Sequence, residues 1–338
     1  MSGGPRLVDD LNRALHTVMA EDDRLYLLGE DIADPYGGAF KVTRGLSTAF
    51  PGRTLSTPIS EQALLGVANG LALQGDRAIV EIMFGDFAAL AFDQLLNVSG
   101  KAGDMYGHGL AMHLVVRCPS GGYRGYGPTH SQSLQKHFIG IPNLQLFELT
   151  PFHPNREVFR HMLGLGKPCL FFEEKTLYAT KAGAARRRDV PFACRLTGAA
   201  PGTALLSVEE PEQADCLIVA PGGMAHLALE AAEWLFLEDE RVATVAVPSR
   251  LYPLDVDPLA RIAARTGRVL VVDQGTGGGT WAETVAHQLH TRLWGRLHRP
   301  VAIVHSKESV IPAAGHLERR VLVQRDWITA ALRELLDV

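Results

Sequence analysis

The sequence predicts an α/β protein of two domains, each built on a mainly parallel sheet covered by helices. Its 338 residues suggest two domains, since about 100–200 residues per domain is usual. Short apolar runs alternate with segments of helical period, a pattern typical of parallel sheets with helices on both faces. The composition, 46% hydrophobic and 21% charged, is that of a globular chain and excludes disordered and collagen-like proteins.

The predicted strands are short and nearly continuous in apolar residues, as buried parallel strands are. In chain order they are Leu25–Leu28, Ala78–Ile82, His113–Arg117, Leu144–Phe147, Cys169–Glu173, Cys216–Ala220, Val242–Val247, Val269–Asp273 and Val301–His305. The predicted helices repeat apolar residues at three- and four-residue spacing. They are Val8–Ala20, Glu61–Leu73, Ala88–Lys101, Arg156–Leu163, Ala225–Phe236, Pro258–Thr266, Ala282–Leu293 and Arg325–Leu336.

Residues 181–213 interrupt this alternation. They are rich in Ala, Gly, Pro and Arg and have no strong period, so we interpret them as a linker, with a hairpin left open. The linker separates an N-terminal domain, residues 1–180, from a C-terminal domain, residues 214–338. Within it, Arg186–Arg188 is interpreted as a solvated turn.

The net charge and the cysteine content limit the classes of partner and the cellular compartment that are expected for this protein. The net charge is −4 and the pI is near 6.4, whereas nucleic-acid binders are usually basic, so we expect no nucleic acid as partner. No apolar run reaches the roughly 18 residues of a membrane span, and the first residues lack the apolar region of a signal peptide. The four cysteines match no zinc or redox spacing, so a reduced, cytoplasmic setting is expected.

Common nucleotide and hydrolase motifs are absent from the sequence. It holds no G-x-x-x-x-G-K-[ST], H-E-x-x-H or G-x-S-x-G. The glycine-rich stretch Asp273–Thr280 follows a predicted strand, but the third glycine of a dinucleotide fingerprint would fall on Thr280. We therefore favour an ordinary strand-to-helix turn there.

Two segments combine strand ends with polar or aromatic residues. In Thr57–Gln62, Ser60 suits the N-cap of a helix, and Glu61 falls in the first turn, where complementing the helix dipole is the simplest explanation. In Glu81–Phe87, Phe84 and Phe87 suit the core, although rings at a strand end also form a flat wall for a planar ligand.

The third segment, Cys118–Gln132, contains four glycines and ends near His130. Loops at strand ends host sites in open α/β sheets, so a structural and a catalytic His130 are about equally favoured. By contrast, His287 and His290 have no third ligand in the pattern and are interpreted as an exposed helix face.

Together these segments resemble the β subunit of the E1 component of 2-oxo acid dehydrogenase complexes, a thiamine-diphosphate family. The resemblance spans nearly the whole chain. It is carried by Gly29–Asp31, Gly37–Phe40, Thr57–Gln62, Phe84–Phe87, Ala91–Gln94, His130–Ser133, Pro168–Tyr178 and Leu251–Asp255. It implies an N-terminal transketolase-like pyrimidine-binding domain and a C-terminal transketolase-type α/β domain.

The resemblance also implies roles for individual residues. Glu61 would hydrogen-bond N1′ of the aminopyrimidine and favour its imino form, which requires a buried carboxyl. Phe87 would pack on the ring, and Ile59 would line the same pocket. Glu30 matches an acidic residue near the path linking paired active sites. His130 would orient the 2-oxo acid or protonate the leaving sulfur. Independently of the resemblance, we expect Arg124 in the glycine-rich loop to pair with a carboxylate.

The metal half of a thiamine site is missing from the sequence. The family pattern is Gly-Asp-Gly followed by Asn, whereas this chain has only Gly75-Asp76-Arg77, Gly85-Asp86-Phe87 and Gly103-Asp104-Met105. The resemblance therefore implies an α subunit that holds Mg²⁺, an α2β2 heterotetramer, and an E2 lipoyl acyltransferase or acyl carrier as acceptor. Whether backbone carbonyls around Leu163–Lys167 bind a monovalent cation such as K⁺ is left open.

The 2-oxo acid is not determined by the sequence. Phe84–Phe87 and His130–Ser133 resemble the branched-chain-type members of the family more than the pyruvate-type ones, and Leu90 suits an apolar or bulkier acyl group. Two alternatives remain at this stage. One is the small half of a split transketolase or carboligase, and the other is a non-catalytic scaffold subunit.

Overall fold

The computed structural model describes residues 4–107, 109–182 and 190–338, and it forms two compact units. Unit 1 comprises Met1–Ser120, His137–Leu149 and His153–Ala182, and unit 2 comprises Gly121–Lys136, Thr150–Phe152 and Gly183–Val338. The loop 121–136 thus groups with the C-terminal part of the chain. The domain limits at residues 180 and 214 stay a prediction, and Arg186–Arg188 lies outside the described residues.

Unit 1 contains a parallel sheet with the strand order β5-β6-β4-β3-β1-β2. Every residue of β4, β5 and β6 is buried, which confirms the prediction from continuous apolar runs. The short edge strand β2 was not predicted. The strands are β1 (Leu25–Glu30), β2 (Thr54–Thr57), β3 (Arg77–Glu81), β4 (Leu114–Ser120), β5 (Gln145–Glu148) and β6 (Cys169–Glu174).

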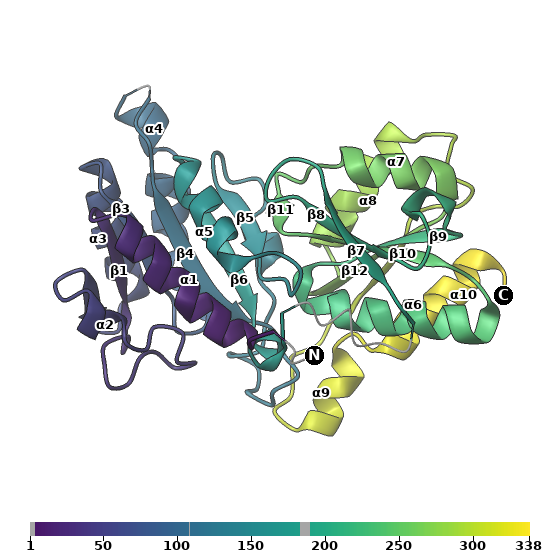
Figure 1. Ribbon diagram of the computed structural model, residues 1–338, viewed down its shortest axis with the longest axis horizontal. Coiled ribbons are helices and arrows are strands. Elements are labelled where there is room, and N and C mark those ends of the chain that lie inside the picture. The colour runs from purple at the N-terminus through teal and green to yellow at the C-terminus, as the bar shows by residue number, and fades with distance from the viewer. Residues whose placement is uncertain (1–3, 108, 183–189) are drawn as a thin grey trace. The chain divides into compact units, whose positions relative to one another are not determined.

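Helices cover both faces of this sheet (Figure 1). The apolar stripe of α1 packs with α5 and the sheet in one core cluster, while α3 packs against β3, β1 and β4. The α3 helix has the predicted bounds. The helices are α1 (Leu7–Glu21), α2 (Leu46–Ala49), α3 (Glu61–Leu73), α4 (Ala102–Met105) and α5 (Asn155–Gly164), with a one-turn 3-10 helix η4 (Lys175–Ala179).

The predicted α-helix at Ala88–Lys101 is wrong. The structure has a 3-10 helix, η1 (Gly85–Ala91), and a π-helix, η2 (Gln94–Ser99). The hydroxyl of Ser99 donates to the carbonyl of Gln94 at 3.0 Å and to Asn69 Oδ1 at 2.7 Å. A side chain bonded into the helix ladder in this way widens a turn, which apolar spacing does not reveal.

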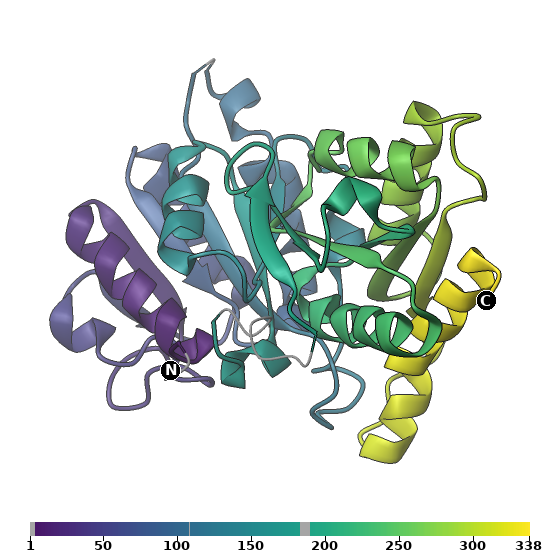
Figure 2. The same cartoon turned by 45° about the vertical axis from the view of Figure 1, so that its right-hand side comes forward.

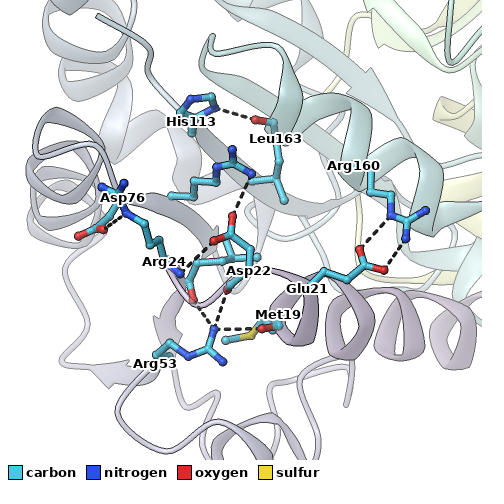
Figure 3. Close-up of polar contacts among 11 residues, drawn as sticks. Met19, Glu21, Asp22, Arg24, Arg53, Asp76, His113, Arg160 and Leu163 are labelled. Carbon is cyan, nitrogen blue, oxygen red and sulfur yellow. Dashed lines mark hydrogen bonds and ion pairs between the residues drawn. The ribbon is translucent and has the colours of Figure 1, made fainter.

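Charged side chains tie the end of α1 to the sheet (Figure 3). Arg53 donates to the carbonyls of Met19 at 3.0 Å and Asp22 at 2.9 Å, and so satisfies oxygens that a helix end leaves open. Arg24 pairs with Asp76 at 3.1 Å. These contacts surround the connection between α1 and β1, the strand that ends at Glu30.

Unit 2 contains a mixed sheet with the order β13-β12-β9-β10-β8-β7. β7 and β8 form an antiparallel hairpin, so the hairpin left open for the linker is present, and β8 also pairs antiparallel with β10. The remaining pairs are parallel. The strands of this sheet are β7 (Ala193–Thr197), β8 (Thr203–Ser207), β9 (Cys216–Val219), β10 (Ala243–Pro248), β12 (Val269–Thr276) and β13 (Ala302–Ser306), whereas the short strand β11 (Arg250–Tyr252) does not belong to it.

In unit 2, α6 and α10 lie side by side on one face of the sheet, and α7 and α8 cover the other (Figures 1 and 2). Among the described residues, no helix combines the length and apolarity needed to cross a membrane. The helices are α6 (Ala225–Asp239), α7 (Asp257–Thr266), α8 (Trp281–Arg292), α9 (Gly315–Val321) and α10 (Arg325–Leu336), with 3-10 turns at η3 (Gln135–Phe138), η6 (Pro211–Gln213) and η7 (Gly222–Met224).

Candidate active site

The carboxyl edge of the unit 1 sheet gathers the segments that the sequence singled out. β1 lies between β2 and β3, and its last residue, Glu30, pairs in register with Thr57. Because these strands are parallel, Glu30, the chain from Thr57 to Glu61 and the chain after Glu81 all meet at one edge. Open α/β sheets bind ligands at this edge.

Glu61 is the first residue of α3 and is only 5% exposed. Its carboxyl accepts no hydrogen bond from the residues that the structure describes. Ser60 occupies the N-cap position, as the sequence predicted, although its side chain makes no capping bond. The start of α3 therefore combines an unbonded carboxyl on a buried residue with a helix end that no side chain caps.

Glu30 is the second buried carboxyl at this edge. It is 4% exposed and accepts a hydrogen bond from the backbone N–H of Ser60 at 3.2 Å. Burial raises the pKa of Glu30, and the nearby charge of Glu61 raises it further. A proton is therefore held at Glu30 more readily than on an ordinary glutamate.

Phe84 and Phe87 stand at the turn that follows β3, and both rings are half-buried. Phe40 packs edge-on against Phe84, with ring centroids 5.5 Å apart. Gly85 between them is pressed against the end of β4, since a Cβ there would lie 3.2 Å from the carbonyl oxygen of Pro119. The aromatic segment is thus supported from beneath by the sheet, as a wall for a planar ligand needs to be.

Two apolar side chains close to these segments in the sequence are unusually open. Ile59 is 78% exposed and Leu90 is 58% exposed. These two large apolar side chains are thus open to solvent on segments that adjoin the site residues in the sequence.

A buried ion network beneath the edge was not found from the sequence. Arg117 of β4 is fully buried and donates to both oxygens of Glu173 at 2.7 Å, and it also pairs with Glu81. Tyr178 donates its hydroxyl to Glu173 at 2.7 Å. Burial opposes the charge of Arg117, but the two carboxylates raise its pKa above the ordinary value. The available signal was one charged residue inside or at the end of each of three predicted apolar strands, namely Glu81, Arg117 and Glu173.

His130 belongs to unit 2, on the loop Gly121–Lys136. Its ring Nδ1 lies 3.0 Å from the hydroxyl of Thr129. Arg124, on the same loop, places its guanidinium 5.8 Å from the ring centre of Tyr126, and its pairing with a carboxylate stays a prediction. Glu30, Ile59, Glu61 and Phe87 are thus brought to one edge of unit 1, whereas His130 is held by the other unit.

The described residues contain no group of three or more His, Cys, Asp or Glu placed to hold a metal ion. His290 accepts the backbone N–H of Val301 at 3.1 Å, which is a structural role. Asp273–Thr280 forms the ordinary strand-to-helix turn that the sequence favoured, and Thr280 and Glu283 close a capping box on α8.

Comparisons with known proteins agree with this architecture. Residues 6–181 match the transketolase pyrimidine binding domain, and residues 207–328 match the transketolase C-terminal domain. The chain is 30% identical to the 2-oxoisovalerate dehydrogenase subunit beta of Bacillus subtilis, over 98% of each chain. It is 31% identical to the acetoin:2,6-dichlorophenolindophenol oxidoreductase subunit beta of Cupriavidus necator, over 96% of each chain.

Two further similarities concern sequence and fold. A pyruvate dehydrogenase E1 component subunit beta from Leifsonia xyli is 30% identical over 95% of this chain and 92% of its own. The solved structure titled split gene transketolase, inactive beta4 tetramer, superposes with a TM-score of 0.73 over 99% of both chains, at 21% identity, which shows a shared fold. The chain belongs to the transketolase-like family of E1 β subunits of 2-oxo acid dehydrogenases.

Proposed function

We propose that this chain acts as the β subunit of a thiamine-diphosphate-dependent E1 enzyme, which decarboxylates a 2-oxo acid and passes the acyl group to a lipoyl-E2 or a related carrier. One observation supports this most strongly. Glu61 is a buried residue at the ligand-binding edge of the sheet, and no described residue bonds to its carboxyl. This carboxyl is therefore available to a ligand that supplies the hydrogen bond.

The residues at this edge fit the pyrimidine half of thiamine diphosphate. When bound, the coenzyme would supply the nucleophilic carbon and the electron sink that the loss of CO2 from a 2-oxo acid needs. Glu61 would hold a proton at the ring nitrogen, and the raised pKa of Glu30 supports proton sharing close to it. Phe87 would pack on the ring, and the exposed Ile59 would line the pocket.

The rest of the site is assigned to partners. We propose that an α subunit holds Mg²⁺ and the diphosphate in an α2β2 heterotetramer, because the sequence has no Gly-Asp-Gly motif. The exposed Ile59 and Leu90 support a covering partner at this surface. His130 is proposed to orient the 2-oxo acid or to protonate the leaving sulfur during acyl transfer.

Two details follow as smaller proposals. Gly166 and Lys167 line a cavity of about 190 Å³ in unit 1 together with Asp104 and Asn143, and this cavity is the proposed place for a monovalent cation such as K⁺.

All four cysteines are free thiols, which supports the cytoplasm as the proposed location.

Replacing Glu61 tests the central proposal. In the assembled α/β complex, Glu61→Gln should abolish 2-oxo acid decarboxylation, a loss of about 100-fold or more, while assembly is retained. The matched control is Glu157→Gln, an exposed carboxylate on α5, which should keep full turnover. Retained turnover in Glu61→Gln would remove the assignment. A ketose-phosphate assay on the wild-type complex separates the E1 activity from that of a split transketolase.

A further inference from the structure

The glycine-rich loop Gly121–Lys136 is anchored within unit 2 on both sides of His130. After His130, Ser133 donates to Gln274, and Lys136 donates to the carbonyls of Thr276 and Gly278, each at 3.0 Å. Before His130, the backbone N–H of Gly125 donates to Glu318 Oε2 at 3.2 Å. The position of His130 within unit 2 therefore depends on both anchors.

The upstream anchor is a buried charge. Glu318 lies on α9 and is only 2% exposed. Its second oxygen, Oε1, is buried and has no hydrogen-bond partner among the described residues. Burying a carboxylate with so few donors costs stability, and an apolar side chain would pack there more cheaply. Packing of α9 therefore does not explain a glutamate at this position.

The loop Gly121–Lys136 packs tightly against α9 and the chain that follows it. A Cβ on Gly122 would collide with Leu322 and would lie 3.3 Å from Glu318 Oε1. Tyr123 packs on the apolar cluster that includes Leu322, and its hydroxyl donates to the carbonyl of Val323 at 2.8 Å. Gly125 has a left-handed φ of +69°, which few other residues adopt. We therefore expect a substitution at position 318 to alter the conformation of the loop backbone.

We propose that Glu318 is a positioning residue, which holds the backbone of Gly125 and thereby orients His130 for acyl transfer. Its charge-assisted hydrogen bond fixes the loop at a point where glycines leave the backbone free to move. The catalytic consequence rests on the proposed role of His130, whereas the effect on the loop does not.

Three variants in the assembled α/β complex test this proposal. Glu318→Leu keeps apolar packing on α9 but removes the acceptor, and Glu318→Gln keeps an acceptor oxygen. Glu334→Ala, which removes an exposed carboxylate of α10, is the control. The measurements are hydrogen exchange of peptides covering residues 121–132, and kcat and KM for acyl transfer.

We expect Glu318→Leu to raise exchange of the loop about 10- to 100-fold, the factor for losing one charge-assisted hydrogen bond. The kcat of acyl transfer should fall about 10-fold with KM for the 2-oxo acid nearly unchanged. Glu318→Gln keeps an acceptor oxygen but not the charge, so it should restore a large part of both, and Glu334→Ala should alter neither.

Unchanged loop exchange in Glu318→Leu would overturn the proposal, as would a Glu318→Gln variant as impaired as Glu318→Leu. His130→Asn separates the two ideas. If it keeps full acyl transfer, the role of His130 fails and with it the expected loss of kcat, while loop exchange still decides the anchoring role of Glu318.

Discussion

Two buried acidic residues between a strand and the helix that follows it, Asp273 in unit 2 and Glu61 in unit 1, differ in the hydrogen bonds that their carboxyls accept. In unit 2, Asp273 accepts the backbone N–H groups of Gly275 at 2.7 Å and Ala282 at 3.1 Å. The helix that follows, α8, is closed by the Thr280 capping box. In unit 1, Glu61 starts α3 without a bond from the described residues, and the N-cap Ser60 leaves that helix end uncapped.

The difference separates a structural carboxylate from one that is available to a ligand. Burial raises the pKa of Asp273, and the backbone donors supplied by its own turn oppose that effect, so its hydrogen-bonding capacity is already used within the turn. Glu61 receives no donor, and the neighbouring Glu30 adds a like charge in place of a counter-ion. Groups kept in this costly state are expected at functional sites, where stability is given up for activity.

The largest expected loss of stability comes from removing the arginine that neutralises two buried carboxylates in unit 1. Arg117→Ala should lower the free energy of unfolding by about 3–5 kcal/mol, since Glu81 and Glu173 would stay buried without a counter-ion. Urea unfolding of the full chain measures this loss. Arg160→Ala is the control because Arg160 also pairs with a glutamate, Glu21, but at the surface, where water screens the two charges and almost no loss of stability is expected. Equal losses would contradict the contrast between closed and exposed pairs.

A smaller effect should distinguish the two turns directly. Asp273→Asn should cost about 1–3 kcal/mol, because an amide N–H₂ would face backbone N–H groups that need an acceptor. Glu61→Gln should cost nothing, or stabilise the chain by about 0.5–2 kcal/mol, since it removes repulsion from Glu30. Thermal unfolding of both variants measures the difference. A marked loss in Glu61→Gln would mean that Glu61 is structural after all.

The smallest effect is a pH dependence at the Glu30 and Glu61 pair. Because the pKa of Glu30 is raised in the folded state, the folded chain binds more protons than the unfolded chain above pH about 4.3, the ordinary glutamate value. The contribution to stability is therefore complete below that pH and is lost as pH rises through the folded pKa.

Glu61→Gln lowers the pKa of Glu30 towards its ordinary value by removing the second cause of the shift. The variant should therefore gain stability relative to wild type as pH rises, whereas Glu157→Gln should run parallel to wild type. Unfolding free energies measured between pH 4 and 8 check this. A difference between Glu61→Gln and wild type that is constant with pH would rule out the coupling.

Local sequence was enough to predict much of the framework. Apolar runs located the central strands of both sheets, and the segment from Thr57 to Leu73 gave α3 with its observed bounds and Glu61 in its first turn. The failed fingerprint at Thr280 correctly indicated a plain turn before α8. These features depend on residues that are neighbours along the chain, so spacing and residue type reveal them.

Other features were decided only by tertiary structure. The bond of Ser99 to Asn69 spans 30 positions and widens the helix that spacing had predicted as regular. Arg117 and Glu173 are 56 positions apart, and Gly125 and Glu318 are 193 apart. Burial and contacts between residues so far apart in the sequence determine the free-energy cost of each charge. The tertiary structure also decides that the loop carrying His130 groups with unit 2. The sequence determined which groups the chain has and the helices and strands that present them, whereas the fold decided which carboxylates are satisfied and which stay open to a ligand.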